Sequence, residues 1–333
     1  MLPRLCLHSL FLAAFAGHAL ASCSYGTHLH PRAEGEEVPV NTFAYTGING
    51  PMNWVALAPE TNSICATGMR QSPINMVDGV FHMVPSSDIK LEIPDFTEGA
   101  EFENLGTTVE VVAKGGSLQL SEANYTLRQF HFHLPSEHLD NGTSIAMEMH
   151  MVFETAEKDI AVIGVFIDLD NGGSPATEDP IATPTPTAAA KRRGFHLRRQ
   201  ESSIAPSPTG SFGGVQGFLT VPMIKAPGIT SPVLETVFSK VGEIKTPGTR
   251  TSTPPLAMGS VVQAIMGGSF QSYSGSLTTP PCKEGVRWFV ATQKLQISTA
   301  TFESVRSVIG FNARYPQNTP GQPNMLQLAR AQV

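Results

Sequence analysis

The segment Gln129–Val152, which reads QFHFHLPSEHLDNGTSIAMEMHMV, carries the strongest structural signal in the chain. His131 and His133 stand two residues apart, and residues at this spacing in a β-strand point to the same face. Phe130 and Phe132 then point to the opposite face, as in a strand that packs one face against a core. We therefore predict a β-strand that presents a pair of imidazoles from one face.

A second strand is predicted after a turn. The dipeptide Asn141-Gly142 is typical of a tight turn, and residues 146–153 again have a strand-like pattern. If the two strands pair, His150 comes to lie beside His131 and His133. The sequence thus predicts three imidazoles that converge from a rigid sheet.

Three neutral imidazoles are a common donor set for catalytic zinc, because such a site keeps a fourth position open for water. Gln129 and Glu148 each precede a histidine by two residues, so each shares that histidine's face and can hold its second ring nitrogen. A single histidine on a strand is more often a structural or exposed residue, and an isolated HxH pair is weak evidence. The pair, the third histidine and the two polar orienting residues together indicate a metal site.

The composition of the 333-residue chain restricts its partners and its location. A formal net charge of −6 argues against nucleic acid as a partner. Residues 1–21 have the pattern of a secretory signal peptide, with an apolar stretch at Leu5–Ala16 and small residues in the segment Ala19–Ala21. That stretch is too short to span a bilayer, and no later stretch is long and apolar enough. We expect a secreted protein without a membrane span, with a flexible leader at residues 22–40.

If the chain is secreted, its cysteines can form disulfides and its sequons can be glycosylated. Beyond the signal peptide the chain contains Cys23, Cys65 and Cys282, an odd number, so the simplest arrangement is one disulfide and one remaining thiol. The sequons at Asn124 and Asn141 are candidate N-glycosylation sites. Asn141 is the favoured site because it lies at a predicted turn.

Short apolar segments separated by Gly, Pro and Asn favour an antiparallel sheet. The predicted strands are Lys90–Ile93, Ala100–Asn104, Thr108–Ala113, Ser117–Leu120, Tyr125–Phe130, Asp159–Leu169 and Val286–Val290. Helices are expected at Ser231–Val241 and Ser298–Ile309, whereas residues 249–272 are expected to be irregular.

Residues 171–217 interrupt this pattern. They are rich in Pro, Ser, Thr, Ala and Gly, and such a segment cannot bury enough apolar surface to offset its ordering entropy. We expect a disordered insertion in a surface loop of a single domain that spans residues 41–333. Its basic run Lys191–Arg193 is either a protease processing site or a solvated charge cluster.

Six short motifs resemble the α-class carbonic anhydrases, in particular secreted microbial, fungal-like members. In chain order they are Gly50-Pro-x-x-Trp54, Gln71-Ser-Pro-Ile-Asn75, Gln129-x-His-Phe-His133, Ser136-Glu-His138, Glu148-x-His150 and Ser276-Leu-Thr-Thr-Pro-Pro281. The resemblance runs from about Phe43 to Gln317 and is interrupted only by the insertion. It implies a mainly β (α+β) fold with a large twisted, mostly antiparallel sheet, short peripheral helices and a conical active-site cavity.

The resemblance also implies a reaction. The expected activity is the reversible hydration of carbon dioxide to bicarbonate and a proton, by attack of zinc-bound hydroxide, chemistry for which carbonic anhydrase is itself the standard example. The implied zinc ligands are His131, His133 and His150. Thr278 matches the threonine that accepts a hydrogen bond from the hydroxide, and Glu137 matches the carboxylate that takes the threonine's proton.

Further residues match the family's substrate pocket. Its apolar wall corresponds to Val152, Val162, Leu277 and Trp288, and its polar floor corresponds to Thr279 and Tyr45. Cys65 and Cys282 flank motif segments, and relatives with cysteines at these places join them in a disulfide. One position departs from the family pattern: Thr107 stands where many fast members carry the histidine that transfers the proton.

Two alternatives remain open from the sequence. The first is a catalytically weak carbonic anhydrase-like binding module. The second is a cupin-type enzyme, in which Glu137 joins His131 and His133 as a ligand of iron or manganese. The cupin alternative is the weaker one because the sequence contains no matching second cupin motif.

Overall fold

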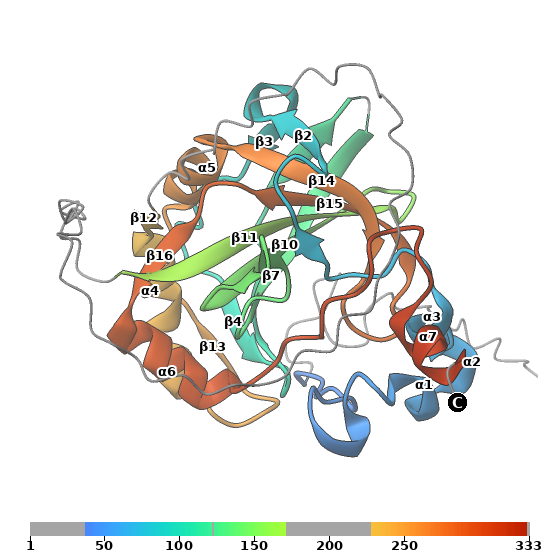
Figure 1. Cartoon of the computed structure of the whole chain (residues 1–333). Helices are drawn as coiled ribbons and strands as arrows, with labels where there is room; N and C mark the ends of the chain where they lie inside the picture. The colour runs from blue at the N-terminus through green and yellow to red at the C-terminus, as the bar shows by residue number, and fades with distance from the viewer. Residues whose placement is uncertain (1–36, 122, 171–227, 332–333) are drawn as a thin grey trace, which may run out of the picture. The chain divides into compact units, whose positions relative to one another are not determined.

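The computed structural model describes residues 37–121, 123–170 and 228–331, and all of them belong to one compact unit (Figure 1). The predicted signal peptide, Cys23 and the insertion at 171–217 lie outside the described residues. Of the predicted flexible leader, residues 37–40 are described, and Val38 among them is buried.

One large sheet forms the framework, and it has 13 strands in the part of the chain that the structure describes. Its main path, from one edge to the other, consists of β13 (Arg250–Ser252), β4 (Glu101–Asn104), β5 (Val109–Val112), β7 (Ala123–His133), β10 (Met147–Glu154), β11 (Ile160–Asp170), β15 (Glu284–Ala291), β14 (Ser269–Ser276) and β2 (His82–Pro85). Off this path are β3 (Lys90–Glu92), β6 (Ser117–Leu120), β12 (Ile229–Thr230) and β16 (Leu295–Ser298). A small second sheet contains β1 (Asn75–Met76), β8 (Leu139–Asp140) and β9 (Thr143–Ser144).

The predicted fold class is confirmed, with one refinement. Most strand pairs are antiparallel, including β7 with β10 and β10 with β11. Strand β11, however, pairs in parallel with both β15 and β16, so the sheet is mixed. These parallel neighbours are far apart in the sequence, and local strand patterns carry no information about such pairings.

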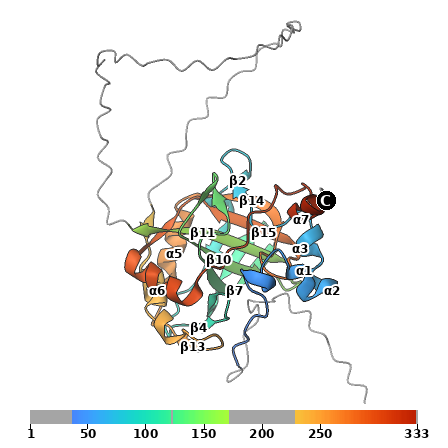
Figure 2. The ribbon, with the colours of Figure 1, turned by 60° about the horizontal axis from the view of Figure 1, so that its bottom comes forward.

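Short helices surround the sheet. They are η1 (Gly47–Asn49), α1 (Trp54–Leu57), α2 (Pro59–Asn62), α3 (Ile64–Thr67), η2 (Ser86–Asp88), α4 (Pro232–Phe238), η3 (Val241–Glu243), α5 (Met258–Met266), α6 (Thr299–Ile309) and α7 (Met325–Ala331). Figure 1 shows α4, α5 and α6 along one side of the sheet. Figures 1 and 2 both show α1, α2, α3 and α7 grouped at another side.

The two predicted helices are present, and their N-termini have the expected caps. The Ser231 side chain accepts a hydrogen bond from the Leu234 N–H at the start of α4, and Ser298 does the same for the Thr301 N–H at the start of α6. A proline occupies the first turn of α4, where its missing N–H costs nothing.

The prediction of an irregular segment at residues 249–272 was wrong. It contains β13, the whole of α5 and the first half of β14. Helix α5 buries Met258, Val261 and Ile265, which share one face at spacings of three and four. Gly259 and the neighbouring polar residues hide this short pattern, and tertiary packing stabilises the helix.

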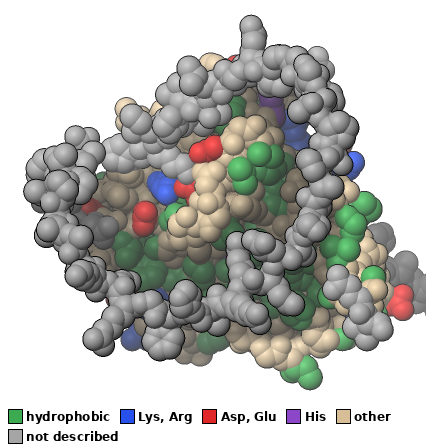
Figure 3. All heavy atoms as spheres, viewed as in Figure 1, with side chains coloured by type: hydrophobic (Ala, Val, Ile, Leu, Met, Phe, Trp, Pro, Cys, Tyr) green, Lys and Arg blue, Asp and Glu red, His purple; other side chains and the backbone are tan. Residues whose placement is uncertain are grey.

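The two faces of β7 have different surroundings, because one face packs into the main apolar core and the other carries the histidines. Phe130 and Phe132 lie in the main core, together with residues from α4, α5 and α6. A second cluster, on the other side of the sheet, contains Val152, Val162 and Trp288. In the described part of the chain no helix is long and apolar enough to cross a bilayer. On the face seen in Figure 3, described hydrophobic side chains are interspersed with polar and charged ones.

Candidate metal centre

The pairing of β7 with β10 brings the three predicted histidines together. His150 lies opposite His131 in the register of the two strands, and Glu148 lies opposite His133. The three histidines are buried, and each offers a ring nitrogen within 4.8 Å of the others. Because both strands belong to the centre of the large sheet, the arrangement is built on rigid elements.

Each imidazole is held through the nitrogen that faces away from this meeting point. His131 Nδ1 lies 2.9 Å from Gln129 Oε1, and His150 Nε2 lies 3.0 Å from Glu148 Oε1. His133 Nδ1 lies 2.8 Å from the main-chain oxygen of Asn312. Asn312 lies 179 residues further along the chain and carries no local signal in the sequence that predicts this contact.

One ring nitrogen of the triad is available for a cation. The buried Nε2 atom of His133 has no hydrogen-bond partner. An unsatisfied buried nitrogen is costly, and a metal ion is one way to satisfy it. Three converging imidazoles with oriented second nitrogens fit zinc, which prefers nitrogen donors in such a set.

A second histidine group adjoins the first. His138 Nδ1 lies 2.6 Å from Glu148 Oε1, and the His138 N–H donates to Glu148 Oε2 at 2.8 Å. His138 Nε2 lies 2.7 Å from the Tyr273 hydroxyl, which in turn lies 2.8 Å from Ser72 Oγ. His138, Glu148 and His150 could also approach one metal ion, but both nitrogens of His138 already have partners. The motif Ser136-Glu-His138 is visible in the sequence, but its pattern does not predict this role of His138.

Glu137 lies at the edge of the triad. Its Oε1 accepts a hydrogen bond from the Arg314 N–H at 2.9 Å, and its side chain is also hydrogen-bonded to Thr278. Its Oε2 lies 3.5 Å from His133 Nε2 and has no hydrogen-bond partner. No sequence pattern predicts the role of Arg314, whose buried guanidinium donates to the Ser72 and Cys65 carbonyls.

Burial controls the protonation of this centre. It lowers the pKa of His133 to about 4, and it holds the pKa of His131 well below the usual value with help from the neighbouring imidazoles. Burial raises the pKa of Glu137 to about 7, although His150, Thr278 and Arg314 act in the opposite direction. Burial alone would raise the pKa of Glu148, but His138 and His150 hold it well below its usual range. The histidines are therefore neutral at pH 7, as metal ligands must be.

The comparisons with known proteins agree with this geometry. The family model of eukaryotic-type carbonic anhydrase matches residues 49–226 and 214–325, which is most of the chain.

The chain belongs to the α-carbonic anhydrase family.

A solved fungal α-carbonic anhydrase from Aspergillus oryzae is 33% identical, with a TM-score of 0.69 over 88% of this chain and 100% of that one. The carbonic anhydrase of Pectobacterium atrosepticum is 26% identical over 84% of this chain and 87% of its own length. That of a Nostoc strain is 28% identical over 84% of this chain and 82% of its own length. Membership of the carbonic anhydrase family excludes the cupin alternative.

The apolar residues that match the carbonic anhydrase pocket lie together beside the triad. Val152, Val162 and Trp288 are neighbours across three consecutive strands, and Leu277 packs against their cluster. The rings of Trp288 and His150 are 4.8 Å apart. The structure thus places an apolar wall next to the third histidine.

The predicted polar residues of the cavity have different surroundings. Tyr45 is buried and presents its ring edgewise to His133, with the ring centroids 6.3 Å apart. Thr279 is half-buried in the turn before Cys282, whose N–H donates to the Thr279 carbonyl. Thr107 is largely buried, and its hydroxyl accepts a hydrogen bond from the Asn41 side chain.

The structure contains the disulfide between Cys65 and Cys282, with an S–S distance of 2.04 Å. It joins α3 to the turn between β14 and β15, and so ties the N-terminal helices to the loop that carries Thr278. Among native disulfides in secreted domains, removal typically costs ~2–5 kcal/mol of stability.

The two sequons have different environments. Asn124 is exposed on β7, next to Gln119 of β6. Asn141 has a positive φ of 49° at its turn, as asparagine tolerates, and its side-chain nitrogen donates to Asp78 Oδ2 at 3.0 Å. Both asparagines remain candidate glycosylation sites.

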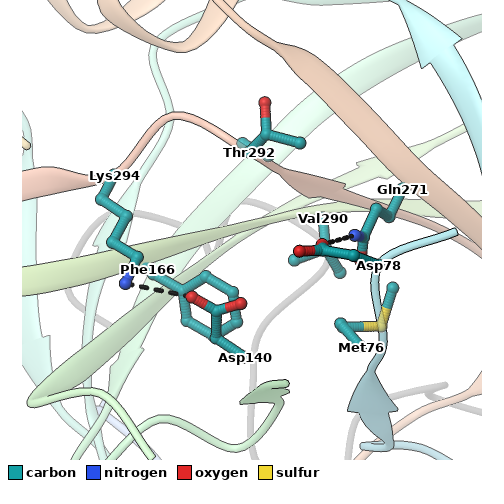
Figure 4. A pocket seen from close by; sticks show the side chains of 9 residues that line it. Met76, Asp78, Asp140, Phe166, Gln271, Val290, Thr292 and Lys294 are labelled. Atoms are coloured by element: carbon teal, nitrogen blue, oxygen red, sulfur yellow. Dashed lines mark hydrogen bonds and ion pairs between the residues drawn. The ribbon is translucent and has the colours of Figure 1, made fainter. Parts of the chain in front are cut away.

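A hollow elsewhere in the molecule, shown in Figure 4, is a poorer candidate for the reaction site than the metal centre. It is too small, and its polar side chains are paired with one another. Its volume is about 20 Å³, room for roughly one water molecule. The Lys294 ammonium lies 3.1 Å from Asp140, and the Gln271 amide donates to Asp78 at 3.0 Å. Its polar groups are thus engaged with one another.

Proposed function

We propose that this chain catalyses the reversible hydration of carbon dioxide to bicarbonate and a proton, with zinc held by His131, His133 and His150. The observation that supports this most strongly is the set of three buried imidazoles, each oriented through its second nitrogen, next to a hydrogen-bonded glutamate–threonine pair. Membership of the carbonic anhydrase family gives the same reaction.

Zinc in such a site supplies the Lewis acidity that makes water a nucleophile at neutral pH, chemistry for which carbonic anhydrase is the standard example. The protein's part is to orient the reactants. A threonine hydroxyl has only one proton. Because Thr278 donates this proton in its hydrogen bond to Glu137, its hydroxyl can only accept a hydrogen bond from the cavity side. The pair therefore selects a reacting group that still carries a hydrogen and fixes its direction.

Glu137 accepts the hydrogen bond from Thr278 most strongly when it is ionised. The Arg314 N–H and the Thr278 hydroxyl both donate to its carboxylate, which favours the charged form against the effect of burial. Arg314 acts here through its main chain, while its guanidinium anchors the loop at Ser72.

The substrate is apolar and the product is charged. Val152, Val162 and Trp288 offer the apolar surface on which carbon dioxide can rest beside His150, with Leu277 as a further neighbour. Bicarbonate gains nothing from such a surface, which favours its release.

The proton must leave by a route other than Thr107. A threonine cannot take up a proton near neutral pH, and the hydroxyl of Thr107 is already bonded to Asn41. We therefore infer that proton release limits turnover in weak buffer. The predicted signal peptide and the disulfide support an extracellular location.

Carbon dioxide hydration, followed by stopped-flow pH indicator with and without a zinc chelator, tests the proposal. We expect activity that the chelator removes and added zinc restores. If the protein holds one zinc ion per chain but hydrates carbon dioxide no faster than buffer without protein, it is instead a carbonic anhydrase-like binding module.

A further inference from the structure

A second hollow adjoins the metal centre, and no step of the proposed reaction uses it. Its volume is about 620 Å³, within the ~300–1,000 Å³ typical of small-molecule sites. Its walls come from three parts of the chain: the residues just after β7, the segment that leads into β10, and α6 with the residues that follow it.

The walls of this hollow are mainly apolar and partly uncovered. Leu134 and Ile145 are buried and form a fixed base. Phe302 on α6 is half-buried, and Phe311, just after the helix, has 56% of its surface exposed. Two phenyl rings next to fixed aliphatic side chains suit a ligand with a flat or branched apolar body.

One cation accompanies this apolar surface. Arg306 lines the hollow and follows Phe302 by four residues, so both side chains lie on the same face of α6. None of the described residues that line the hollow is acidic. The Arg306 guanidinium lies 3.6 Å from Glu303, but both side chains are about 60% exposed, 63% and 59%. An exposed pair of this kind contributes only ~0–1 kcal/mol, so the guanidinium can turn to another anion at little cost.

We propose that this hollow is a binding site for a small monocarboxylate with an aromatic or branched apolar body. The body packs against Phe302, Phe311 and Leu134. The carboxylate pairs with Arg306, whose planar fork matches a carboxylate in two parallel hydrogen bonds. Both features of the hollow are needed: the charge of Arg306 fixes the orientation of the ligand, and the apolar side chains supply most of the affinity.

The hollow is separate from the metal centre but adjacent to it. The Leu134 N–H donates to Asn312 Oδ1 at 2.6 Å, and the Asn312 N–H donates to the Leu134 carbonyl at 2.9 Å. Asn312 also holds His133, yet none of the three histidines lines the hollow. Binding there therefore requires neither zinc nor catalytic activity, and the proposal stands or falls independently of the proposed function.

Isothermal titration of the full-length, zinc-loaded chain with 3-phenylpropionate tests the site. Acetate carries the charge without the body, and 3-phenylpropan-1-ol carries the body without the charge. We expect one equivalent of 3-phenylpropionate to bind roughly tenfold more tightly than the alcohol, the effect of one charge-assisted hydrogen-bonded pair. Acetate should show no saturable binding in the same concentration range.

Two variants and a control locate the binding. Arg306→Gln should weaken 3-phenylpropionate about tenfold and leave the alcohol unchanged, whereas Phe311→Ala should weaken both about fivefold. Arg250→Gln is the matched control, since Arg250 also sits in an exposed pair, 3.5 Å from Glu101, and does not line the hollow. It should bind both ligands as the unmodified chain does.

Chelator-treated protein separates this site from carboxylate binding at the metal. The affinity for 3-phenylpropionate should stay within about twofold after zinc removal, whereas binding at the metal would be lost. Absence of saturable binding, loss of binding with the zinc, or indifference to both Arg306→Gln and Phe311→Ala would each overturn the proposal.

Discussion

Two buried histidine groups lie next to each other in this sheet, and the contrast between them shows what makes a metal site. The rings of His138 and His150 are 6.1 Å apart. Both nitrogens of His138 have partners, Glu148 on one side and Tyr273 on the other. His133, in the triad, has one nitrogen bonded to the main-chain oxygen of Asn312, and its other nitrogen is buried without a hydrogen-bond partner. Both groups are buried, but the first brings three imidazoles together, and His133 in it has a ring nitrogen without a hydrogen-bond partner, whereas both ring nitrogens of His138 are engaged.

The largest expected difference between the groups is in zinc content. His133→Ala should abolish stoichiometric zinc binding, and His131→Ala or His150→Ala should do the same, because each removes a ligand. His138→Ala should retain one zinc per chain and lose ~1–3 kcal/mol of stability, since Glu148 and Tyr273 each lose one buried hydrogen bond to the imidazole. Elemental analysis after dialysis, together with urea unfolding, measures both effects. Loss of zinc in a folded His138→Ala protein would show that the second group also holds the metal.

The orienting residues should have the next largest effect on the metal. Gln129→Ala and Glu148→Ala should each weaken zinc affinity roughly 10–100-fold, the range for partners that orient a ligand. Glu148→Ala should be the more damaging change because Glu148 contacts both His150 and His138. Competition with a chromophoric chelator gives the affinities. Equal losses in the two variants would mean that the second group contributes nothing to the first.

Thr278 should affect rate and leave the metal in place. Thr278→Ala removes the hydrogen bond to Glu137, so the reacting group is no longer held in one direction, and a loss of orientation costs on the order of 100-fold in rate. We expect full zinc content with a lowered kcat for carbon dioxide hydration. Thr236→Ala on α4 is the control and should leave both unchanged. A Thr278→Ala protein without zinc would indicate that the residue supports the metal directly.

The metal-free protein should lose stability in acid. Burial lowers the pKa of His133 from 6.5 to about 4, and those of His131 and His150 are lowered as well. Below pH 6.5 the unfolded chain therefore binds protons that the folded chain does not, and the free energy of unfolding falls as the pH falls towards 4. The slope is at most ~1.4 kcal/mol per pH unit for each histidine.

Glu137 has the opposite effect on the free energy of unfolding, which it raises as the pH falls through the same range. Its pKa is raised to about 7, so between its ordinary value of 4.5 and pH 7 the folded chain holds a proton that the unfolded chain lacks. This contribution is complete below pH 4.5 and is lost as the pH rises through 7. Glu137→Gln should therefore steepen the acid loss of chelator-treated protein, as measured by urea unfolding from pH 7.5 to 5. An identical slope in the variant would mean that Glu137 is ionised throughout.

The smallest effect concerns proton release. Thr107→His should raise kcat a few-fold in weak buffer, because a histidine can carry a proton near neutral pH. The Asn41 side chain contacts Thr107 and restricts the room for a larger residue there, so we expect the double variant Asn41→Ala, Thr107→His to gain more than the single one. Imidazole buffer should raise the rate of the unmodified chain in a saturable way. A high rate that is indifferent to buffer would show that another residue already carries the proton.

The sequence by itself determined the elements that carry the triad. A period of two places His131 and His133 on one face of β7 and the phenylalanines on the other, whatever the remainder of the fold. The same rule puts Gln129 and Glu148 on the faces of their histidines. Serine caps at Ser231 and Ser298 likewise fix where α4 and α6 begin.

Only the tertiary structure decided which distant groups complete the site. Asn312 reaches His133 across 179 residues, Arg314 reaches Glu137 across 177, and Tyr273 reaches His138 across 135. Such contacts leave no periodic signal, because they form only after the sheet has set the register of its strands. The 620 Å³ hollow beside His133 has the same origin, since its walls meet only when α6 packs near the end of β7.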